Sequence, residues 1–487
     1  MVVELIRGPT AVRIYCNQDR RLSDNPEISI HPWLKNNLIE YEYDPREKRS
    51  FVKYNYYRYE RETGILHLPV NLINQLIDYL KDNGAEYKII PLDANPSITF
   101  DIDLTANFEK REYQEKAAEF LISDGHMKAL SLQTGDGKTL VAIKVIVALR
   151  QRSLIVLPAF LVDQWTKVFS NITTAKIDVI RGSKSIFNLI NNDYQSDANI
   201  FLASINTIYE YAIRNSQYES APSFQTFIRK LGIGIKIVDE CHLNFHANTM
   251  IDIQSDVKHN IYLSATHMRS AKNSERIFQR IYPEEIRYKN SNRDNYINIT
   301  EVRFSIGDIP EFFYKTVRGY SHFKYEKYLL KKIGRLNYLV EKVFEPLVEE
   351  YFITIRKPNQ KLLILVALTE FGNLISEWLK TRYPDLKVST YFNETPNEIL
   401  ETSDIIVSTI GSCGTGKDIK GLRTVILTTS FSAETLTLQT VGRLRKMEDT
   451  PEFVYLVNTA IGQQIRHAKI RSEIYSGIAK KFRSVVF

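Results

Sequence analysis

The residues best suited to chemistry in this chain lie in a glycine-rich segment that ends in lysine and threonine. The segment reads Leu132-Gln133-Thr134-Gly135-Asp136-Gly137-Lys138-Thr139. Its glycines let the backbone approach an anion, and successive N–H groups at a helix N-terminus can hold phosphates. We expect Lys138 to reach the β- and γ-phosphates of a nucleotide and the Thr139 hydroxyl to bind Mg²⁺. The strict phosphate-loop pattern has glycine in place of Leu132, so a glycine turn with an unrelated lysine is the alternative.

Two adjacent carboxylates form the second candidate. Asp239 and Glu240 directly follow the apolar run Ile235–Val238. Buried carboxylates are costly unless they have partners or a function. We expect Asp239 to hold Mg²⁺ through water, and Glu240 to act as the general base that activates the attacking water. Alternatively, the two acids could simply cap the N-terminus of a helix. The candidate phosphate loop upstream in the same lobe favours a catalytic role for them.

The elements that must position these residues are short buried strands separated by amphipathic helices. Such runs are typical of parallel strands in βαβ units. The runs are 129–132, 154–157, 200–203, 235–238 and 261–263, then 362–366, 405–407, 425–427 and 454–456. This alternation of strands and helices stops after residue 263 and begins again at residue 362. We therefore predict an α/β protein with two tandem lobes, at 101–295 and 296–487, each built on a parallel sheet.

Residues 1–100 differ from the rest and predict a small α+β accessory domain. Their alternating, tyrosine-rich pattern indicates short antiparallel strands, and 71–83 has helical spacing. The segment from Arg46 to Arg61 interleaves basic residues with aromatic ones and could bind duplex or junction DNA. The alternative is a hairpin whose aromatic side chains form a small core.

Two further basic segments stand out. The stretch from Tyr320 to Glu350 predicts a long helix that carries Lys324, Lys327, Lys331, Lys332 and Arg335. The segment from Gln463 to Phe487 holds six basic residues and one acid, and is interpreted either as a contact for a polyanion or as a solvated helix face or frayed tail.

Composition limits the function classes. The net charge is +7 and the pI is about 8.9, which suits a polyanionic partner. No signal peptide is apparent, and no apolar run reaches the ~18 residues that a membrane span needs. Cys16, Cys241 and Cys413 lie far apart, which argues against a disulfide framework or a structural zinc site. We expect a cytoplasmic monomer; if phage-encoded, it would act in the host cytoplasm.

The ordered set of motifs resembles the superfamily 2 helicases. The matching segments are Arg111–Gln114, Thr134–Thr139 (motif I), Pro158 with Gln164 and Trp165 (Ia), Arg181-Gly182, Ser204–Thr207, Asp239–His242 (II), Ser264–Thr266 (III), Ser408-Thr409 with Gly414–Asp418 (V), and Gln439 with Gly442-Arg443 (VI). Within that superfamily the chain resembles the group of UvsW, RecG and XPB motors, and in it the branch-migration helicases of T5-like phages. The resemblance implies two RecA-like lobes, ATP hydrolysis and work on branched DNA, such as fork regression and Holliday-junction migration.

The resemblance also implies roles for individual residues. Nucleotide binding falls to Arg111, Gln114, Thr134, Gly135, Asp136, Gly137, Lys138, Thr139 and Asp418, with Mg²⁺ on Thr139 and Asp239. Catalysis falls to Lys138, Asp239, Glu240, Gln439, Arg443 and Lys446. Contact with nucleic acid falls to Pro158, Gln164, Arg181, Gly182, Ser204, Thr207, Ser408 and Thr409, and coupling to His242, Ser264 and Thr266. ATP is expected to bind between the lobes and to close them.

Several alternatives stay open. The family usually has a second arginine where this chain has Lys446, and Arg445 lies one place early, so either residue could serve as the second cation. An RNA helicase and a restriction-type DNA translocase subunit could use the same motor. A binding scaffold with an inactive ATP site is disfavoured by the intact Lys138, Asp239 and Glu240.

Overall fold

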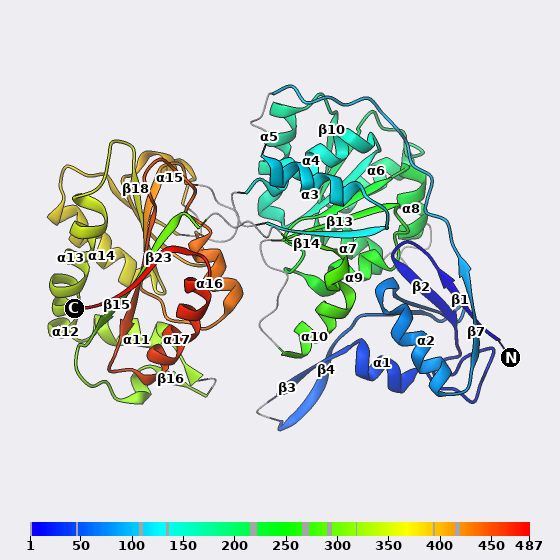
Figure 1. The fold of residues 1–487 in the computed structure, drawn as a ribbon, viewed down its shortest axis with the longest axis horizontal. Helices are drawn as coiled ribbons and strands as arrows, with labels where there is room; N and C mark the ends of the chain where they lie inside the picture. Colours follow the sequence, from blue (N-terminus) through cyan, green and yellow to red (C-terminus); the bar gives the residue numbers. More distant parts are fainter. Residues whose placement is uncertain are drawn as a thin grey trace. The chain divides into compact units, whose positions relative to one another are not determined.

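The computed structural model divides the chain into two compact units, residues 1–290 and 291–487, and each is described by itself (Figure 1). The structure describes residues 2–44, 47–106, 111–132, 136–214, 222–264, 272–289, 295–317, 319–392, 395–413 and 419–487. Within these ranges no helix is long and apolar enough to cross a membrane.

The larger sheet of unit 1 has seven parallel strands. They are β8 (Met127–Ser131), β9 (Ser153–Leu157), β10 (Ile177–Ile180), β11 (Ile200–Ser204), β12 (Ile235–Val238), β13 (His259–Ser264) and β14 (Arg287–Lys289). Their order across the sheet is β10-β11-β9-β12-β13-β8-β14. Because every pair is parallel, the carboxyl ends of all seven strands meet at one edge.

Helices cover both faces of this sheet. One face packs against α3 (Glu112–Ile122), α4 (Lys138–Leu149) and, after η2 (Ala159–Leu161), α5 (Val162–Ile172). The other packs against α6 (Gly182–Asn191), α7 (Ile205–Arg214), α8 (Phe224–Leu231), α9 (Phe245–Asp252) and α10 (Lys272–Ile281), with η4 (Glu284–Ile286) before β14. Alternate residues of each strand contribute to the two cores, as the period of a β-strand requires.

The sheet of unit 2 repeats the same plan. Its strands are β15 (Ile297–Phe304), β18 (Lys361–Val366), β19 (Val388–Tyr391), β20 (Ile405–Thr409), β21 (Leu422–Leu427), β22 (Glu452–Asn458) and β23 (Ala479–Val486), in the order β19-β20-β18-β21-β22-β15-β23. If the strands of each sheet are numbered along the chain, both sheets read 3-4-2-5-6-1-7. Each position in one sheet therefore has a topological equivalent in the other. The prediction of two tandem lobes with parallel sheets is confirmed.

The helices of unit 2 also lie on both faces of its sheet. One core contains side chains of α11 (His322–Leu330), α12 (Ile333–Leu339), η6 (Val340–Phe344), α13 (Glu345–Val348), η7 (Glu349–Ile353) and α14 (Thr369–Arg382). The other contains side chains of α15 (Glu398–Thr402), α16 (Glu434–Val441) and α17 (Gly462–Ser476). A small hairpin of β16 (Lys315–Thr316) and β17 (Gly319–Tyr320) follows η5 (Glu311–Phe313).

The predicted N-terminal α+β region is present in unit 1. Its sheet has the order β5-β6-β2-β1-β7 and contains β1 (Val2–Arg7), β2 (Ala11–Tyr15), β5 (Arg58–Glu60), β6 (Ile65–Pro69) and β7 (Glu86–Pro91). The helices α1 (His31–Asn37) and α2 (Ile73–Asp82, preceded by η1, Val70–Leu72) pack on it, and α2 matches the predicted helix. Its apolar core is continuous with the α6–α10 face of the large sheet.

A separate two-stranded ribbon, β3 (Ile39–Asp44) and β4 (Arg49–Asn55), extends from this region (Figure 1). Its base is fixed to the large lobe, because Tyr54 stacks on His246 of α9 at 4.5 Å and Ser274 of α10 donates a hydrogen bond to Glu40 at 2.5 Å. Tyr56 is buried at this base, whereas Phe51 and Tyr43 farther along are exposed. The predicted hairpin is present and is buried only at its base, while binding of DNA by the 46–61 segment stays a prediction.

Two expectations about the basic segments were wrong. The stretch 320–350 is not one long helix, because α11 ends at Leu330 and α12 begins at Ile333. The C-terminal segment is not a frayed tail, because it forms α17 and then β23, which pairs with β15 along its length. Nor is it only a solvated helix face, because Arg471 is fully buried and donates a hydrogen bond to the Thr429 carbonyl at 3.2 Å.

Candidate nucleotide site and nucleic-acid interface

The order of strands in unit 1 separates the predicted site residues into two groups at the carboxyl edge. The nucleotide candidates follow β8, β12 and β13, which are close neighbours in the sheet. The nucleic-acid candidates Pro158, Arg181 and Ser204 follow β9, β10 and β11, which form the other half. The sheet thus presents two adjacent sets of functional groups along one edge.

The glycine-rich segment leads directly into α4. Gln133, Thr134 and Gly135 lie outside the described residues. Gly137 has a φ of 85°, and an added Cβ would come within 2.5 Å of Gln114 Nε2, so both its conformation and its surroundings favour glycine. Lys138 and Thr139 begin the helix. The described part, a glycine with positive φ directly before a helix that begins at Lys138, has the local structure that a phosphate loop requires.

Gln114 holds the end of this loop. Its Nε2 donates a hydrogen bond to the Asp136 carbonyl at 2.9 Å, and the Tyr113 hydroxyl donates to the same oxygen at 3.0 Å. Gln114 is buried, and its Oε1 has no hydrogen-bond partner among the described residues. Arg111 contacts the Tyr113 hydroxyl at 3.3 Å. A buried, unpaired amide oxygen beside a phosphate loop is suited to accept an N–H of a bound base.

Lys138 faces the acidic pair. Its Nζ lies 3.5 Å from Glu240 Oε1, and its side chain is only 10% exposed. Within the described part of the chain this ammonium group makes no hydrogen bond. A buried charge needs partners, and triphosphate oxygens would supply them. The lysine is therefore positioned for a phosphate ligand.

Asp239 is held in place from two sides. Trp165 Nε1 donates a hydrogen bond to its Oδ2 at 3.0 Å, and the Glu240 backbone N–H donates to its Oδ1 at 2.9 Å. Burial, and then the neighbouring Glu240 charge, raise the pKa of Asp239 to about 6, although Lys138 opposes the rise. A divalent cation would favour the ionised carboxylate, so this residue fits a Mg²⁺ ligand.

Glu240 has a backbone φ of 49°, which is unusual for a residue with a Cβ and projects its side chain from a tight turn. The carboxylate lies 3.4 Å from His242 Nδ1, and the same Nδ1 lies 2.7 Å from the Ser264 hydroxyl. Both His242 and Ser264 are buried. The structure therefore connects the ends of β12 and β13 through Glu240, His242 and Ser264, while Thr266 lies outside the described residues.

Equivalent strands of the two sheets end in the same hydroxyl arrangement. After β11, Ser204 Oγ accepts the Thr207 N–H at 3.2 Å and contacts the Thr207 hydroxyl at 2.9 Å. After β20, Thr409 Oγ1 accepts the Ser412 N–H at 3.1 Å and donates to the Ser412 hydroxyl at 2.8 Å. Ser412 was not predicted. Ser408 is buried and donates to the Tyr391 carbonyl, so it supports the strand end rather than facing solvent.

The other predicted contact residues lie at strand ends in unit 1. Pro158 precedes η2, and Gln164 is exposed on α5. Arg181 is exposed and pairs with Asp163 at 3.0 Å. Gly182, with φ of 69°, begins α6. Pro158, Arg181 and Gly182 thus follow strand ends at the carboxyl edge, Gln164 lies in the first turn of α5, and their contact with nucleic acid stays a prediction.

In unit 2, Gln439 and Arg443 line one pocket of about 250 Å³. The rest of its lining comes from Leu365 of β18, from Ile410, Gly411 and Cys413 after β20, and from α16. Arg445 turns back to the Gly442 carbonyl, and Lys446 is exposed. Asp418 lies outside the described residues. The motif VI candidates Gln439 and Arg443 thus share a pocket with the segment that directly follows β20.

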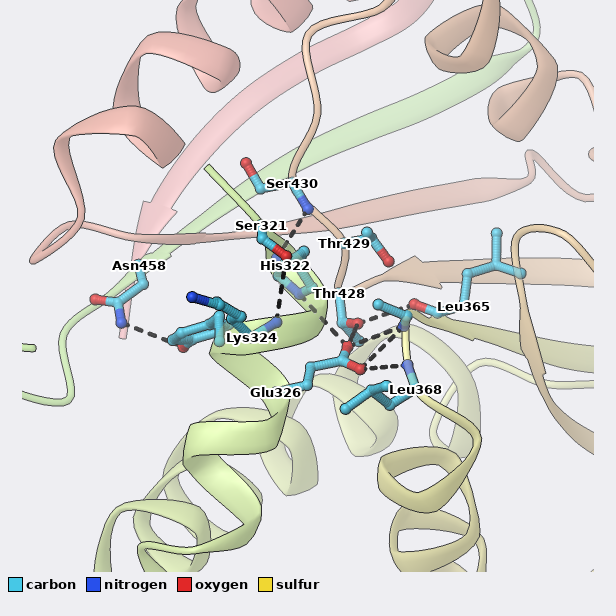
Figure 2. Close-up of polar contacts among 12 residues, drawn as sticks. Ser321, His322, Lys324, Glu326, Leu365, Leu368, Thr428, Thr429, Ser430 and Asn458 are labelled. Carbon is cyan, nitrogen blue, oxygen red and sulfur yellow. Dashed lines mark hydrogen bonds and ion pairs between the residues drawn. The ribbon is translucent and has the colours of Figure 1, made fainter. Parts of the chain in front are cut away.

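A buried polar cluster, not predicted from the sequence, fixes α11 to the carboxyl edge of the unit 2 sheet (Figure 2). Glu326 is 1% exposed, and its carboxylate accepts the Ala367 N–H, the Leu368 N–H at 2.6 Å and the Thr428 hydroxyl at 3.2 Å. His322 Nε2 lies 3.4 Å from the same carboxylate, and His322 Nδ1 accepts the Ser430 N–H at 3.3 Å. This cluster positions the connection that leads from β21 to α16.

The comparisons with known proteins agree with this arrangement. The family model of the type III restriction enzyme, res subunit, matches residues 107–269. No curated protein shows significant sequence similarity. Yeast (S. cerevisiae) Dbp5 bound to RNA and ADP BeF3 is 14% identical over 78% of this chain and 90% of that chain, with a TM-score of 0.50. The ATP-dependent type ISP restriction-modification enzyme LlaBIII bound to DNA is 13% identical over 78% of this chain and 31% of that chain, with a TM-score of 0.51.

The structure of phage T4 UvsW aligns over the full length of both chains at 16% identity, but with a TM-score of 0.37, so it does not distinguish the UvsW group. At these identities the similarity establishes the fold. The chain has two RecA-like lobes with a small N-terminal sheet region. With the family match and the placement of Lys138, Asp239 and Glu240, this fold indicates an ATP-hydrolysing enzyme of the helicase type.

Proposed function

We propose that this protein is an ATP-driven helicase or translocase that moves on DNA, and that branched DNA is its substrate. The observation that carries the proposal is the Lys138 ammonium group, which is buried 3.5 Å from Glu240 without a hydrogen bond among the described residues. This is the arrangement expected of a phosphate-binding lysine that lies beside a general base.

Each of these groups would have one role in ATP hydrolysis. Lys138 and the N-terminus of α4 bind and orient the phosphates. Thr139 and Asp239 hold Mg²⁺, which neutralises charge that develops on the phosphate oxygens. Glu240 orients the attacking water and takes its proton. Gln439, Arg443 and Lys446 supply polar and cationic groups from unit 2, with Arg443 as the arginine finger.

Nucleic acid would bind at the strand ends that carry hydroxyl groups. The pairs Ser204 with Thr207 and Thr409 with Ser412 each combine a capped turn with hydroxyls suited to phosphate oxygens. Because the two pairs follow equivalent strands, each lobe would hold the same kind of backbone group. Movement of one lobe against the other during ATP turnover then advances the protein without reading sequence.

The choice of DNA and of branched substrates is supported by the motif set and by the N-terminal region, whose exposed aromatic and basic ribbon is suited to stacking and phosphate contact. An RNA helicase is the second candidate, because the similar Dbp5 structure contains RNA. A restriction-type translocase is the third, because the family model and LlaBIII come from restriction enzymes.

The test compares wild-type protein with Lys138→Ala and with Lys176→Ala, which removes an exposed lysine of the same unit. We expect Lys138→Ala to lower kcat for ATP by at least about 1,000-fold while DNA binding persists, and Lys176→Ala to match wild type. Hydrolysis should be stimulated most by forked and four-way DNA among single-stranded, duplex, branched and RNA substrates. Retained turnover in Lys138→Ala would remove the site assignment, and a preference for structured RNA would move the proposal to the second candidate.

A further inference from the structure

The surface of α11 combines uncompensated positive charge with exposed aromatic side chains. Phe323, Lys324, Lys327 and Lys331 are exposed at spacings of three and four residues, so they form one stripe along the helix. The helix has one acidic residue, Glu326, and it is buried on the opposite face. Neither Lys327 nor Lys331 forms an ion pair among the described residues.

Neighbouring elements extend this surface. Phe312 of η5 is 67% exposed and Phe323 is 60% exposed. Phe313 stacks on Tyr328 of α11 at 4.5 Å, so η5 lies against the helix. Lys324 Nζ donates to the Lys315 carbonyl at 2.8 Å, which joins β16 to α11. We name the surface formed by Phe312, Phe323, Lys324, Lys327 and Lys331 the α11 patch.

The buried Glu326 cluster fixes the α11 patch in a defined place. Its carboxylate binds the groups that directly follow β18 and β21, so α11 is held at the carboxyl edge of the sheet (Figure 2). β20 is the neighbour of β18, and the Thr409–Ser412 hydroxyl pair follows β20 at this same edge. The helix that carries the α11 patch and the proposed phosphate-binding hydroxyls are therefore held at the same edge of the unit 2 sheet.

We propose that the α11 patch binds single-stranded nucleic acid, as an extension of the phosphate contacts at Thr409 and Ser412. The inference rests on the proposed function. Lysines spaced along one helix face track a phosphate backbone, and exposed phenylalanines stack on unpaired bases, which duplex does not offer. Burial of Glu326 keeps the only negative charge of the helix away from the strand.

The test uses the full chain and a fluorescent single-stranded oligonucleotide. The triple variant Lys324→Ala/Lys327→Ala/Lys331→Ala is compared with Lys342→Ala/Lys380→Ala/Lys387→Ala, which removes three exposed lysines from other parts of the same unit. We expect the first to weaken binding about tenfold or more and to reduce the slope of log K against log salt by about 2, because each lost contact contributes ~0.7. The matched triple should change neither.

The variant Phe323→Ala distinguishes the contribution of base stacking to single-strand binding from that of the lysine charges. It should weaken single-strand binding about tenfold, within the range for base stacking, with the salt slope unchanged and binding to blunt duplex unaffected. Circular dichroism and thermal unfolding check that each variant is folded. If wild type fails to bind any nucleic acid, the proposed function fails. If wild type binds and both triples and Phe323→Ala bind equally well, or if only duplex binding falls, the assignment of the α11 patch is overturned and the proposed function stands.

Discussion

The hydrogen bond from Trp165 to Asp239 is the most informative single contact at the candidate site. It joins residues 74 positions apart, and it leaves the indole with its only donor committed to the carboxylate. Groups that orient a metal ligand typically change metal affinity or activity by about 10- to 100-fold when removed. Trp165 is therefore a positioning residue for Asp239.

We expect Trp165→Phe to raise the Mg²⁺ concentration needed for half-maximal ATP hydrolysis by about tenfold. The hydrogen bond lowers the pKa of Asp239, so its loss should raise that pKa further above its ordinary value and shift the acid limb of Mg²⁺-dependent activity to higher pH. A Mg²⁺ titration at several pH values measures both effects. Trp378→Phe, in unit 2, should leave both unchanged; an unaltered Mg²⁺ requirement in Trp165→Phe would contradict the role.

At this scale the sequence indicates which residues carry the chemistry but not how they are held. Lys138, Asp239 and Glu240 were predicted from their spacing after apolar runs, and the structure brings Lys138 and Glu240 together. The hydroxyl partner Ser412 and the buried Glu326 were missed. Ser and Glu are common on surfaces, and only the fold reveals that their partners are backbone groups of distant segments.

At the scale of elements, α11 depends on one carboxylate. Replacement of Glu326 by alanine leaves the backbone N–H groups of Ala367 and Leu368 without an acceptor, whereas the Thr428 hydroxyl keeps the Leu365 carbonyl at 3.0 Å. Each unsatisfied group costs about 1–3 kcal/mol, so we expect Glu326→Ala to reduce the free energy of unfolding of unit 2 by about 3 kcal/mol or more.

Urea denaturation of the full chain, followed by unit 2 fluorescence from Trp378, measures this loss. Glu377→Ala is the matched control, because Glu377 is an exposed acid whose partner Lys380 lies on the same helix. Loss of the Glu377–Lys380 ion pair should lower the free energy of unfolding by less than about 1 kcal/mol. Equal stabilities for the two variants would show that the carboxylate does not hold α11.

The elements that the sequence failed to reveal share a physical property. The buried strands β9, β18 and β20 contain continuous apolar runs and were predicted, as was β12, in which Lys236 interrupts the apolar residues. β23 lies at the sheet edge, and its sequence AKKFRSVV alternates with charge, so it resembles a solvated segment. β15 is interrupted by Glu301, whose carboxylate is buried because Tyr455 donates to it at 2.7 Å. A strand stabilised by distant polar partners carries no local signal of its own.

At the scale of the whole molecule, the N-terminal region and the first lobe are one folding unit. Their apolar cores are continuous, so removal of residues 1–100 would expose buried side chains of α6–α10 and would not test the region's function. Arg13 of β2 pairs with Asp256 at 2.5 Å, with both side chains buried. Gln225 donates to the same carboxylate at 2.7 Å.

We expect Arg13→Ala to destabilise unit 1 by about 3–5 kcal/mol, because it leaves Asp256 buried without its cation. Unfolding should remain a single transition for the N-terminal sheet and the lobe together, as measured by hydrogen exchange under increasing denaturant. Lys176→Ala, which breaks an exposed pair, should cost less than about 1 kcal/mol. Separate unfolding of the N-terminal sheet in wild type would contradict a shared core.

The repeated 3-4-2-5-6-1-7 order has a consequence for stoichiometry. Where β12 ends in Asp239 and Glu240, its counterpart β21 leads to Thr428 and Thr429, and where β8 leads to Lys138, β15 leads to Ser305, Ile306 and Gly307. At these equivalent positions the second sheet has neither the acids nor the lysine that we propose for hydrolysis. The molecule therefore has two equivalent sheets but one proposed ATP site, and each cycle of the whole chain would consume one triphosphate.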